Sequence, residues 1–283
     1  MKLRWAMILA ACLGAAGWGG AARGAETVHE KPAELIAQAR VLFEKGSWDA
    51  SQDIYHRAAV SPRIEDRIRA YEGLVELYSK LKMTKKAAGV KAALENEKAL
   101  LLRLVPTDPS FYRKIKVKKG DSYARVAARE KVSRKWLEMA NAGRTIRAGE
   151  EILVPDRPFY LVVRKDERKL YWWRGAEEIL KVYPVSIGRK ETQTPEGEYR
   201  VIEKVEDPVW YREGKIISAG DPKNLLGTRW MGLDVKGYGI HGTRYPGSIG
   251  NAVSHGCVRM LNRDVEELFE WVPVGTVVVI QSS

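Results

Sequence analysis

The stretch HGTRYPGSIGNAVSHGCVRM, residues 241–260, holds two of the chain's four histidines and one of its two cysteines. A thiol attacks a carbonyl carbon as its thiolate, so a nucleophilic Cys257 needs a nearby base and surroundings that favour the charged form. His241 and His255 are the candidate bases. Gly256 lets the main chain turn sharply, so the backbone amides of His255, Gly256 and Cys257 are candidate donors to the oxyanion of an acyl-transfer intermediate.

Arg259 lies two residues beyond the thiol and projects on the same side if this segment is extended. Its guanidinium suits a carboxylate on the substrate. Three other interpretations stay open. Cys257 could be a small buried hydrophobic residue, the pair of histidines could join it as zinc ligands, or His255 could only orient the turn.

The N-terminus has the order of a secretory signal peptide, in which charged residues are followed by an apolar run and then by small residues. The residues concerned are Lys2 and Arg4, the run from Trp5 to Trp18, and Ala22, Gly24 and Ala25. We therefore expect a signal peptide over residues 1–25; a buried N-terminal helix is the alternative. Residues 9–12, LAAC, also resemble a lipobox, but we rank a lipid anchor on Cys12 second because the preceding apolar run is short.

In an exported mature chain, Cys257 would be the only thiol of the folded part and would lack an intramolecular partner, which favours a reactive thiol. The chain carries 48 Lys and Arg against 36 Asp and Glu, a net charge of +12. Such a balance favours an anionic partner. Export argues against nucleic acid and for an acidic polymer of the periplasm or cell envelope, although a merely soluble basic surface is an alternative. No later apolar run approaches the roughly 18 residues that span a bilayer, so we expect no transmembrane helix in the mature chain.

The rest of the sequence divides into three segments that differ in their predicted secondary structure. Residues 30–106 show apolar positions at helical spacing, interrupted by KGSWD. The pattern resembles tetratricopeptide-type helical hairpins, with Ala39, Trp48, Tyr55 and Ala58 near that repeat's preferred positions. We expect this region to hold a protein partner or to serve as a spacer.

Residues 113–156 predict a small α+β unit in the order strand, helix, helix, strand. Ser122 and Ser133 are candidate N-caps of the two helices. The segment resembles a LysM domain through the KKGD opening, Asn141, Gly149 and the closing strand that ends at Pro155. The resemblance implies binding to glycans that contain N-acetylglucosamine, such as peptidoglycan.

Residues 158–283 are rich in predicted strands, including two around the polar turn of YLVVRKDERKLYWWRG. One amphipathic helix interrupts them late, with Asn262 as its candidate N-cap. The fold class that we predict is therefore multidomain: helical hairpins, then the small βααβ unit, then a mostly-β catalytic domain.

This last segment resembles the YkuD-type L,D-transpeptidase catalytic domain. The resemblance rests on TPEGEY, NLLG, YGIHGT and SHGCVRM, which occur in that order. It implies a β-sandwich-like fold and a site with Cys257, His241, His255 and Gly256 in catalysis. We further expect substrate contacts from Arg259, Ser254, Gly242 and Thr243.

The resemblance also implies the reaction. The cysteine would attack the amide between the third residue and D-Ala of a peptidoglycan tetrapeptide stem, release D-Ala and pass the acyl group to an amine, forming a 3→3 cross-link when the amine belongs to another stem. No cofactor and no metal ion are expected. The alternatives are an L,D-carboxypeptidase with the same site and a non-catalytic scaffold that binds peptidoglycan.

Overall fold

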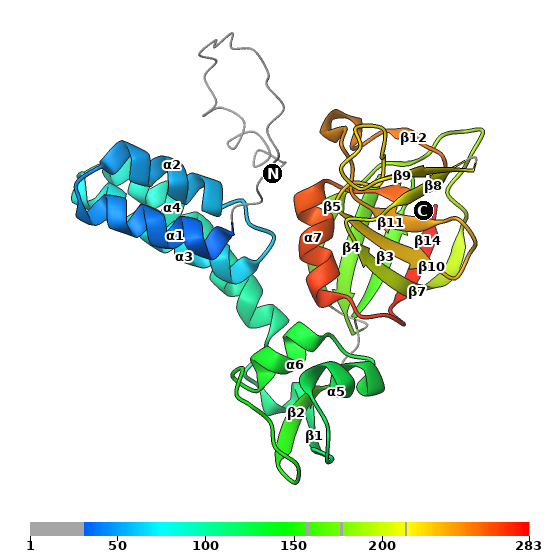
Figure 1. Ribbon diagram of the computed structural model, residues 1–283, viewed down its shortest axis with the longest axis horizontal. Coiled ribbons are helices and arrows are strands. Elements are labelled where there is room, and N and C mark those ends of the chain that lie inside the picture. Colours follow the sequence, from blue (N-terminus) through cyan, green and yellow to red (C-terminus); the bar gives the residue numbers. More distant parts are fainter. Residues whose placement is uncertain (1–30, 157–158, 176–177, 213, 283) are drawn as a thin grey trace, which may run out of the picture. The chain divides into compact units, whose positions relative to one another are not determined.

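The computed structural model describes residues 31–156, 159–175, 178–212 and 214–282 (Figure 1). The expected signal peptide and Cys12 lie outside these residues. Within the described ranges, no helix combines the length and the apolar character that crossing a membrane requires.

Four helices open the described chain: α1 (Pro32–Glu44), α2 (Trp48–Ala58), α3 (Ile64–Lys80) and α4 (Thr84–Leu104). They pack as two consecutive pairs, α1 with α2 and α3 with α4. The apolar positions at helical spacing form their shared core, since Ala39, Ala58 and Leu74 are fully buried. Ser51 is buried between α1 and α2, where its hydroxyl donates a hydrogen bond to the carbonyl oxygen of Ala39 at 2.8 Å.

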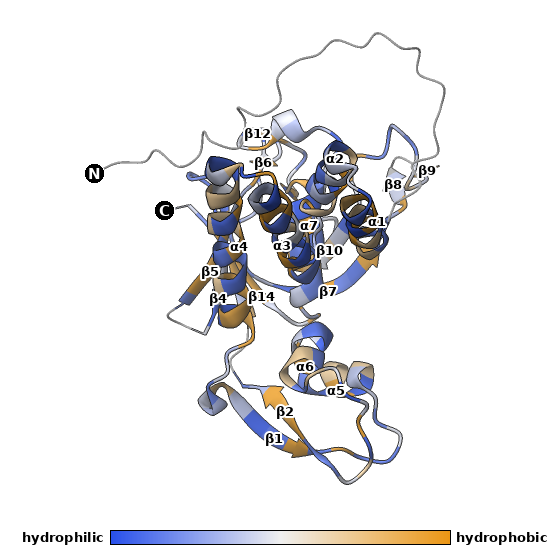
Figure 2. Ribbon diagram, turned by 90° about the vertical axis from the view of Figure 1, so that its left-hand side faces the viewer, coloured by the Kyte–Doolittle hydropathy of each residue, from blue (hydrophilic) through white to orange (hydrophobic). Residues whose placement is uncertain are grey.

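The next segment has the predicted order of elements. A short 3-10 turn, η1 (Pro109–Phe111), leads into β1 (Tyr112–Lys116), followed by α5 (Tyr123–Glu130), α6 (Arg134–Ala140) and β2 (Glu151–Pro155). β1 and β2 pair antiparallel. Ser122 and Ser133 are the N-caps of the two helices, and each hydroxyl accepts the amide of the residue three positions later. Figure 2 shows β2 as mainly hydrophobic and β1 as largely hydrophilic. In keeping with this, β1 exposes most of its residues, whereas most of β2 is buried.

The C-terminal segment is built on a curled eight-stranded sheet with the order β13-β11-β10-β7-β14-β3-β4-β5 (Figure 1). The strands are β3 (Phe159–Arg164), β4 (Lys169–Arg174), β5 (Glu178–Pro184), β7 (Gly197–Glu206), β10 (Arg229–Leu233), β11 (Gly239–His241), β13 (Val258–Arg259) and β14 (Val277–Gln281). The two strands predicted around the polar turn are β3 and β4, which pair antiparallel. Alternate residues of β3 are buried, as expected for a strand with one face against a core.

Smaller elements complete this segment: β6 (Ile187–Gly188), β8 (Trp210–Arg212), β9 (Lys215–Ile217), η2 (Pro246–Ser248), β12 (Ala252–Ser254) and the helix α7 (Asn262–Trp271). The helix occurs where the sequence predicts it, but the prediction of its cap is wrong. Leu261 is the N-cap residue and makes no side-chain cap bond, while Asn262 is the first helical residue. The Asn262 side chain instead accepts the backbone amide of Thr243, which lies outside the helix.

The short strands β11 and β13 bring the motifs YGIHGT and SHGCVRM together. They run parallel, with Ile240 opposite Val258 and His241 opposite Arg259. Ile240 and Val258 are 0% and 1% exposed, so this pair faces the core. Because successive residues of a strand point to opposite faces, His241 and Arg259 share the other face of the sheet.

Candidate active site

Cys257 immediately precedes β13, and its thiol is on the same side as Arg259 and His241. Its position one residue before β13 places it beside Gly239 of β11, and a hydrogen bond from the Gly239 backbone reaches the thiol. The sulfur atom is also 3.6 Å from the carbonyl oxygen of Gly237. The backbone that precedes His241 thus surrounds the thiol.

Cys257 is partly exposed, so a reactant can reach it. Burial raises the pKa of the thiol above its usual value, although the Gly239 hydrogen bond and the Arg259 charge oppose this effect. The thiol is therefore protonated in the resting site, and it needs a base before it can act as a nucleophile.

His241 is 3% exposed, and its Nδ1 lies 2.7 Å from the carbonyl oxygen of Gly242. A carbonyl oxygen only accepts hydrogen bonds, so we assign the ring hydrogen to Nδ1, which leaves the lone pair of the neutral ring on Nε2. Burial, and then the charge of Arg259, lower the pKa of His241 to about 4, against the opposing effect of hydrogen bonds to the backbone of Gly242 and Leu226. The imidazole is consequently neutral at physiological pH and can accept a proton.

Within the described residues, no hydrogen bond joins the Cys257 thiol to the His241 ring. Hydrogen bonds between catalytic groups are often long before the substrate binds and tighten in the reacting complex. The charge of Arg259 acts on both groups, since it lowers the pKa of the His241 ring and of the Cys257 thiol. The three side chains therefore form one cluster on the face of β11 and β13 opposite Ile240 and Val258.

Arg259 is a buried cation, 8% exposed. Burial lowers its pKa, and Cys257 and Tyr245 oppose this shift. Its Nε atom has no hydrogen-bond partner, and no carboxylate among the described residues forms an ion pair with it. Since a buried charge is costly unless an opposite charge compensates it, this guanidinium is suited to bind an anionic group of a ligand.

The turn that carries the thiol is fixed by Ser254, which is fully buried. The Ser254 hydroxyl donates to the carbonyl oxygen of Cys257 at 2.7 Å and accepts the Gly256 amide at 3.1 Å. Gly256 has φ +116°, and a Cβ atom there would lie 2.5 Å from the Tyr238 ring, so the turn requires glycine. In this structure the Gly256 amide, one of the three expected oxyanion donors, is bound to the Ser254 hydroxyl. The amides of His255 and Cys257 remain the candidates.

The second expected base, His255, has an exposed side chain at this turn, whereas His241 is buried. The burial and fixed ring of His241 favour it as the base. Ser254, for its part, uses its hydroxyl inside the turn, so its geometry fits a positioning role better than the substrate contact expected from the sequence.

Gly242 and Thr243 form the loop that follows His241, and both are buried. The Gly242 amide donates to the carbonyl oxygen of Arg229, and the Thr243 hydroxyl accepts the amide of Tyr245 at 3.1 Å. These polar groups, which were expected to contact substrate, hold the shape of the loop in this structure.

The sequence analysis missed three residues that shape this site. Tyr238 packs against the thiol turn, Gly239 donates to the sulfur, and Asn262 holds the loop after His241. The first two immediately precede Ile240 and His241 in the motif YGIHGT, which was a usable signal. Asn262 had only a capping pattern, which suggested a different role.

The zinc site considered from the sequence is not supported. In the described part of the chain, no group of three or more His, Cys, Asp and Glu side chains is placed to hold a metal ion.

Comparisons with known proteins agree with this chemistry. Residues 158–280 match the family model of the YkuD L,D-transpeptidase catalytic domain. The protein named L,D-transpeptidase YkuD in Bacillus subtilis is 37% identical over 174 residues, which cover 58% of this chain and 96% of that protein. Its counterpart in Bacillus licheniformis is 36% identical, with the same two coverages. The protein named L,D-transpeptidase YqjB in Bacillus subtilis is 50% identical over 104 residues; the match covers 35% of this chain and 58% of that relative.

Among solved structures, an L,D-transpeptidase from Mycobacterium tuberculosis H37Rv is 17% identical, with 60% of this chain and 90% of that chain covered and a TM-score of 0.38. The catalytic domain of the E. faecium L,D-transpeptidase is 26% identical, with coverages of 44% and 96% and a TM-score of 0.37.

The match to the two YkuD proteins extends over nearly their whole length. The family model matches the part of this chain that carries Cys257, His241 and Arg259. A scaffold without catalytic activity, the alternative considered from the sequence, is thereby set aside: the chain belongs to the YkuD family of L,D-transpeptidases and is an enzyme of that class.

Proposed function

We propose that this enzyme uses Cys257 to cleave the amide between the third residue and D-Ala of a peptidoglycan tetrapeptide stem and transfers the acyl group to an amine in the cell envelope. The observation that carries the proposal is the cluster on β11 and β13. It combines a partly exposed thiol, a buried neutral imidazole and a buried cation that has no carboxylate partner among the described residues.

In the acylation step, Nε2 of His241 accepts the thiol proton as the sulfur of Cys257 forms a bond to the carbonyl carbon. The carbonyl oxygen becomes negative, and the amides of His255 and Cys257 are the candidate donors to it. The carbon–nitrogen bond then breaks, His241 returns the proton to the departing amine of D-Ala, and a thioester remains on the enzyme.

In the second step an acceptor amine attacks the thioester and gives a proton to His241, which returns it to the sulfur. An amine from another stem yields a 3→3 cross-link, and an amine of a lipoprotein or of a free D-amino acid yields attachment or exchange. Water as acceptor would give L,D-carboxypeptidase activity with the same residues.

Arg259 gives the site its preference for a substrate with a carboxylate near the scissile amide. If its guanidinium only holds this carboxylate, the Arg259→Ala variant will raise KM more than it lowers kcat. A variant with unchanged KM and a large loss in kcat would instead indicate that Arg259 acts on the reacting groups.

Mass spectrometry of muropeptides tests the proposed reaction. The mature protein is incubated with sacculi rich in tetrapeptide stems, and the Cys257→Ser variant serves as the matched control. We expect 3→3 dimers and released D-Ala with the unmodified enzyme only. Tripeptide monomers without dimers would assign carboxypeptidase activity, and equal product from the Cys257→Ser variant would exclude the cysteine mechanism.

We further infer that residues 113–156 bind the glycan strands. The support is the βααβ order with β1 paired to β2, together with the LysM-like sequence marks. Chitin oligosaccharides should therefore release the Cys257→Ser variant from sacculi in a sedimentation assay. Binding that these oligosaccharides leave unchanged would argue against glycan recognition by this unit.

A further inference from the structure

The helices that precede the βααβ unit share an interior with the catalytic segment. Ile64 of α3 and Leu104 of α4 are fully buried in the same core as Leu161 and Trp172 of the curled sheet. Side chains of α4 also reach β5, the edge strand, where Arg103 donates to Glu178 at 2.9 Å. The helices α3 and α4 thus pack against the chain's own catalytic segment. From the sequence, we had expected this region to bind a partner or to serve as a spacer.

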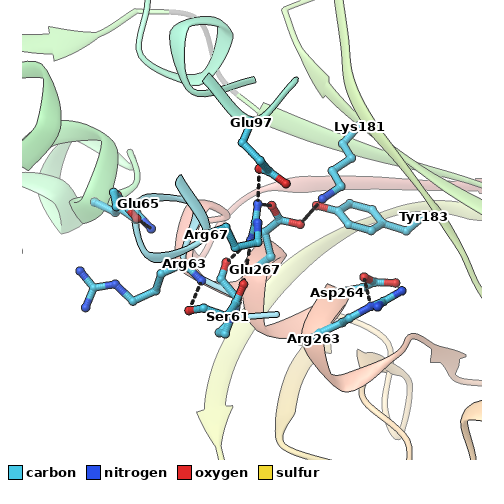
Figure 3. A network of polar contacts seen from close by, with 12 residues as sticks. Ser61, Arg63, Glu65, Arg67, Glu97, Lys181, Tyr183, Arg263, Asp264 and Glu267 are labelled. Atoms are coloured by element: carbon cyan, nitrogen blue, oxygen red, sulfur yellow. Dashed lines mark hydrogen bonds and ion pairs between the residues drawn. The ribbon is translucent and has the colours of Figure 1, made fainter. Parts of the chain in front are cut away.

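Arg67 of α3 connects the helical region to α7 through a buried charge network (Figure 3). Its guanidinium donates to Glu267 of α7 at 2.7 Å and to Glu97 of α4 at 2.8 Å. The carboxylate of Glu267 also accepts hydrogen bonds from Lys181 at 2.5 Å and from the hydroxyl of Tyr183 at 3.1 Å. Arg67 and Glu267 are only 8% and 2% exposed.

The network holds Glu267 as a carboxylate. Burial by itself would raise the pKa of Glu267, but Lys181 and then Arg67 outweigh it, and the pKa is lowered. Without Arg67, the buried carboxylate of Glu267 and the partly exposed carboxylate of Glu97 would lose the cation that joins them. A buried charge that has lost a partner destabilises the packing around it. The position of α7 therefore depends on α3.

The opposite end of α7 holds the loop that follows His241. The Oδ1 atom of Asn262 accepts the Thr243 amide at 2.9 Å. It also lies so close to Gly242 that a Cβ atom there would be 2.2 Å away. The carbonyl oxygen of Gly242 is the acceptor for Nδ1 of His241. A displacement of α7 would consequently move the group that orients the imidazole.

We propose that Arg67 is a positioning residue for the active site, acting through Glu267, the helix α7 and Asn262 on the loop that orients His241. Asn262 and Glu267 are about 7.5 Å apart along the helix axis, so α7 transmits a shift as a rigid element. Arg67 itself touches neither the substrate nor the reacting atoms. This inference rests on the proposed function, because it assigns His241 as the base.

The test measures acylation by a tetrapeptide donor with the full-length protein and its Arg67→Met variant, at a temperature where circular dichroism shows both to be folded. We expect Arg67→Met to lower the acylation rate at saturating donor by roughly 10- to 100-fold, the scale of an ångström-sized misplacement. KM should change little, because the carboxylate site at Arg259 is not involved. Arg67→Lys, which keeps the charge, should recover part of the rate.

The matched control is Lys98→Met. Lys98 of α4 forms an exposed ion pair with Glu72 of α3, so this variant removes a charge contact between α3 and α4 that does not involve α7. It should leave the acylation rate unchanged. A merely structural role for Arg67 would lower the melting temperature and leave the rate of the folded variant unaltered, and that result would overturn the proposal. If Arg67→Met does not fold, the same comparison uses Arg67→Lys and Glu267→Gln.

A double-mutant cycle tests the route. Arg67→Met and Asn262→Ala should be less than additive in their effects on the acylation rate if both act on the same loop, whereas additive effects would contradict transmission through α7. Cys257→Ser is measured in parallel. Full activity of Cys257→Ser would disprove the proposed function, whereas an active wild type, an inactive Cys257→Ser and an unaffected Arg67→Met would reject only the positioning role.

Discussion

At the scale of single residues, His241 and His255 differ in burial and therefore in expected role. His241 is buried with its Nδ1 bound to a carbonyl oxygen, while the His255 side chain is exposed. We expect His241→Ala to slow acylation by roughly 10² to 10⁴, the range for loss of a positioned base, and His255→Ala to cost less than roughly tenfold. Stopped-flow acylation of both folded variants checks this. A slow His255 variant beside a fast His241 variant would reverse the assignment.

The pH dependence of acylation follows from the same ring. His241 must be neutral to accept the thiol proton, and its pKa is lowered from 6.5 to about 4. The acid limb of kcat/KM should therefore fall only as the pH approaches about 4, well below the ordinary histidine value. Rates measured between about pH 4 and 8 on folded enzyme provide the test. An acid limb centred near 6.5 would show that the ring is not held neutral by burial.

At the scale of elements, the turn between β12 and β13 controls where the thiol points. Gly256→Ala would place a Cβ atom 2.5 Å from the Tyr238 ring at φ +116°. We expect a loss of roughly 1–3 kcal/mol of stability, typical of a strained backbone position, and a much larger proportional loss of acylation. Gly247→Ala is the control, since no atom lies within 4 Å of its Cβ position. Urea midpoints and acylation rates that are equal for the two variants would contradict a required glycine.

At the scale of the whole molecule, two buried groups make stability depend on pH in the same direction. The folded pKa of His241 is below its ordinary value, so its contribution is complete above about 6.5 and is lost as the pH falls toward about 4. The folded pKa of Glu267 is also lowered, so its contribution is lost on further acidification. The shift of His241 corresponds to roughly 3 kcal/mol. We expect the urea midpoint to fall between about pH 7 and 5.

The His241→Gln variant isolates this effect, because glutamine does not titrate. Its urea midpoint should change much less between about pH 7 and 5 than that of the unmodified protein. The same decrease in both proteins would mean that another group causes the pH dependence.

The sequence alone predicted many of the elements and supplied the candidates for the reactive residues. Helical spacing located the four N-terminal helices, the two serine caps located α5 and α6, and alternation located β3 and β4. These signals are local, because hydrogen bonds and side-chain periodicity within a segment determine them. The motifs YGIHGT and SHGCVRM likewise singled out Cys257 and His241 as candidates before any contact was known.

Only the tertiary structure decided what the surroundings of these residues do. The parallel pairing of β11 with β13 set Cys257, His241 and Arg259 on one face, and burial, which no local pattern reveals, set their protonation states. The Gly256 amide and the Asn262 side chain took partners that sequence reasoning had not given them. Segments that looked like separate modules share a core and a buried ion pair between Arg67 and Glu267, 200 positions apart in the chain. Such long-range contacts depend on how complete elements pack against one another, and for that reason sequence spacing does not encode them in readable form.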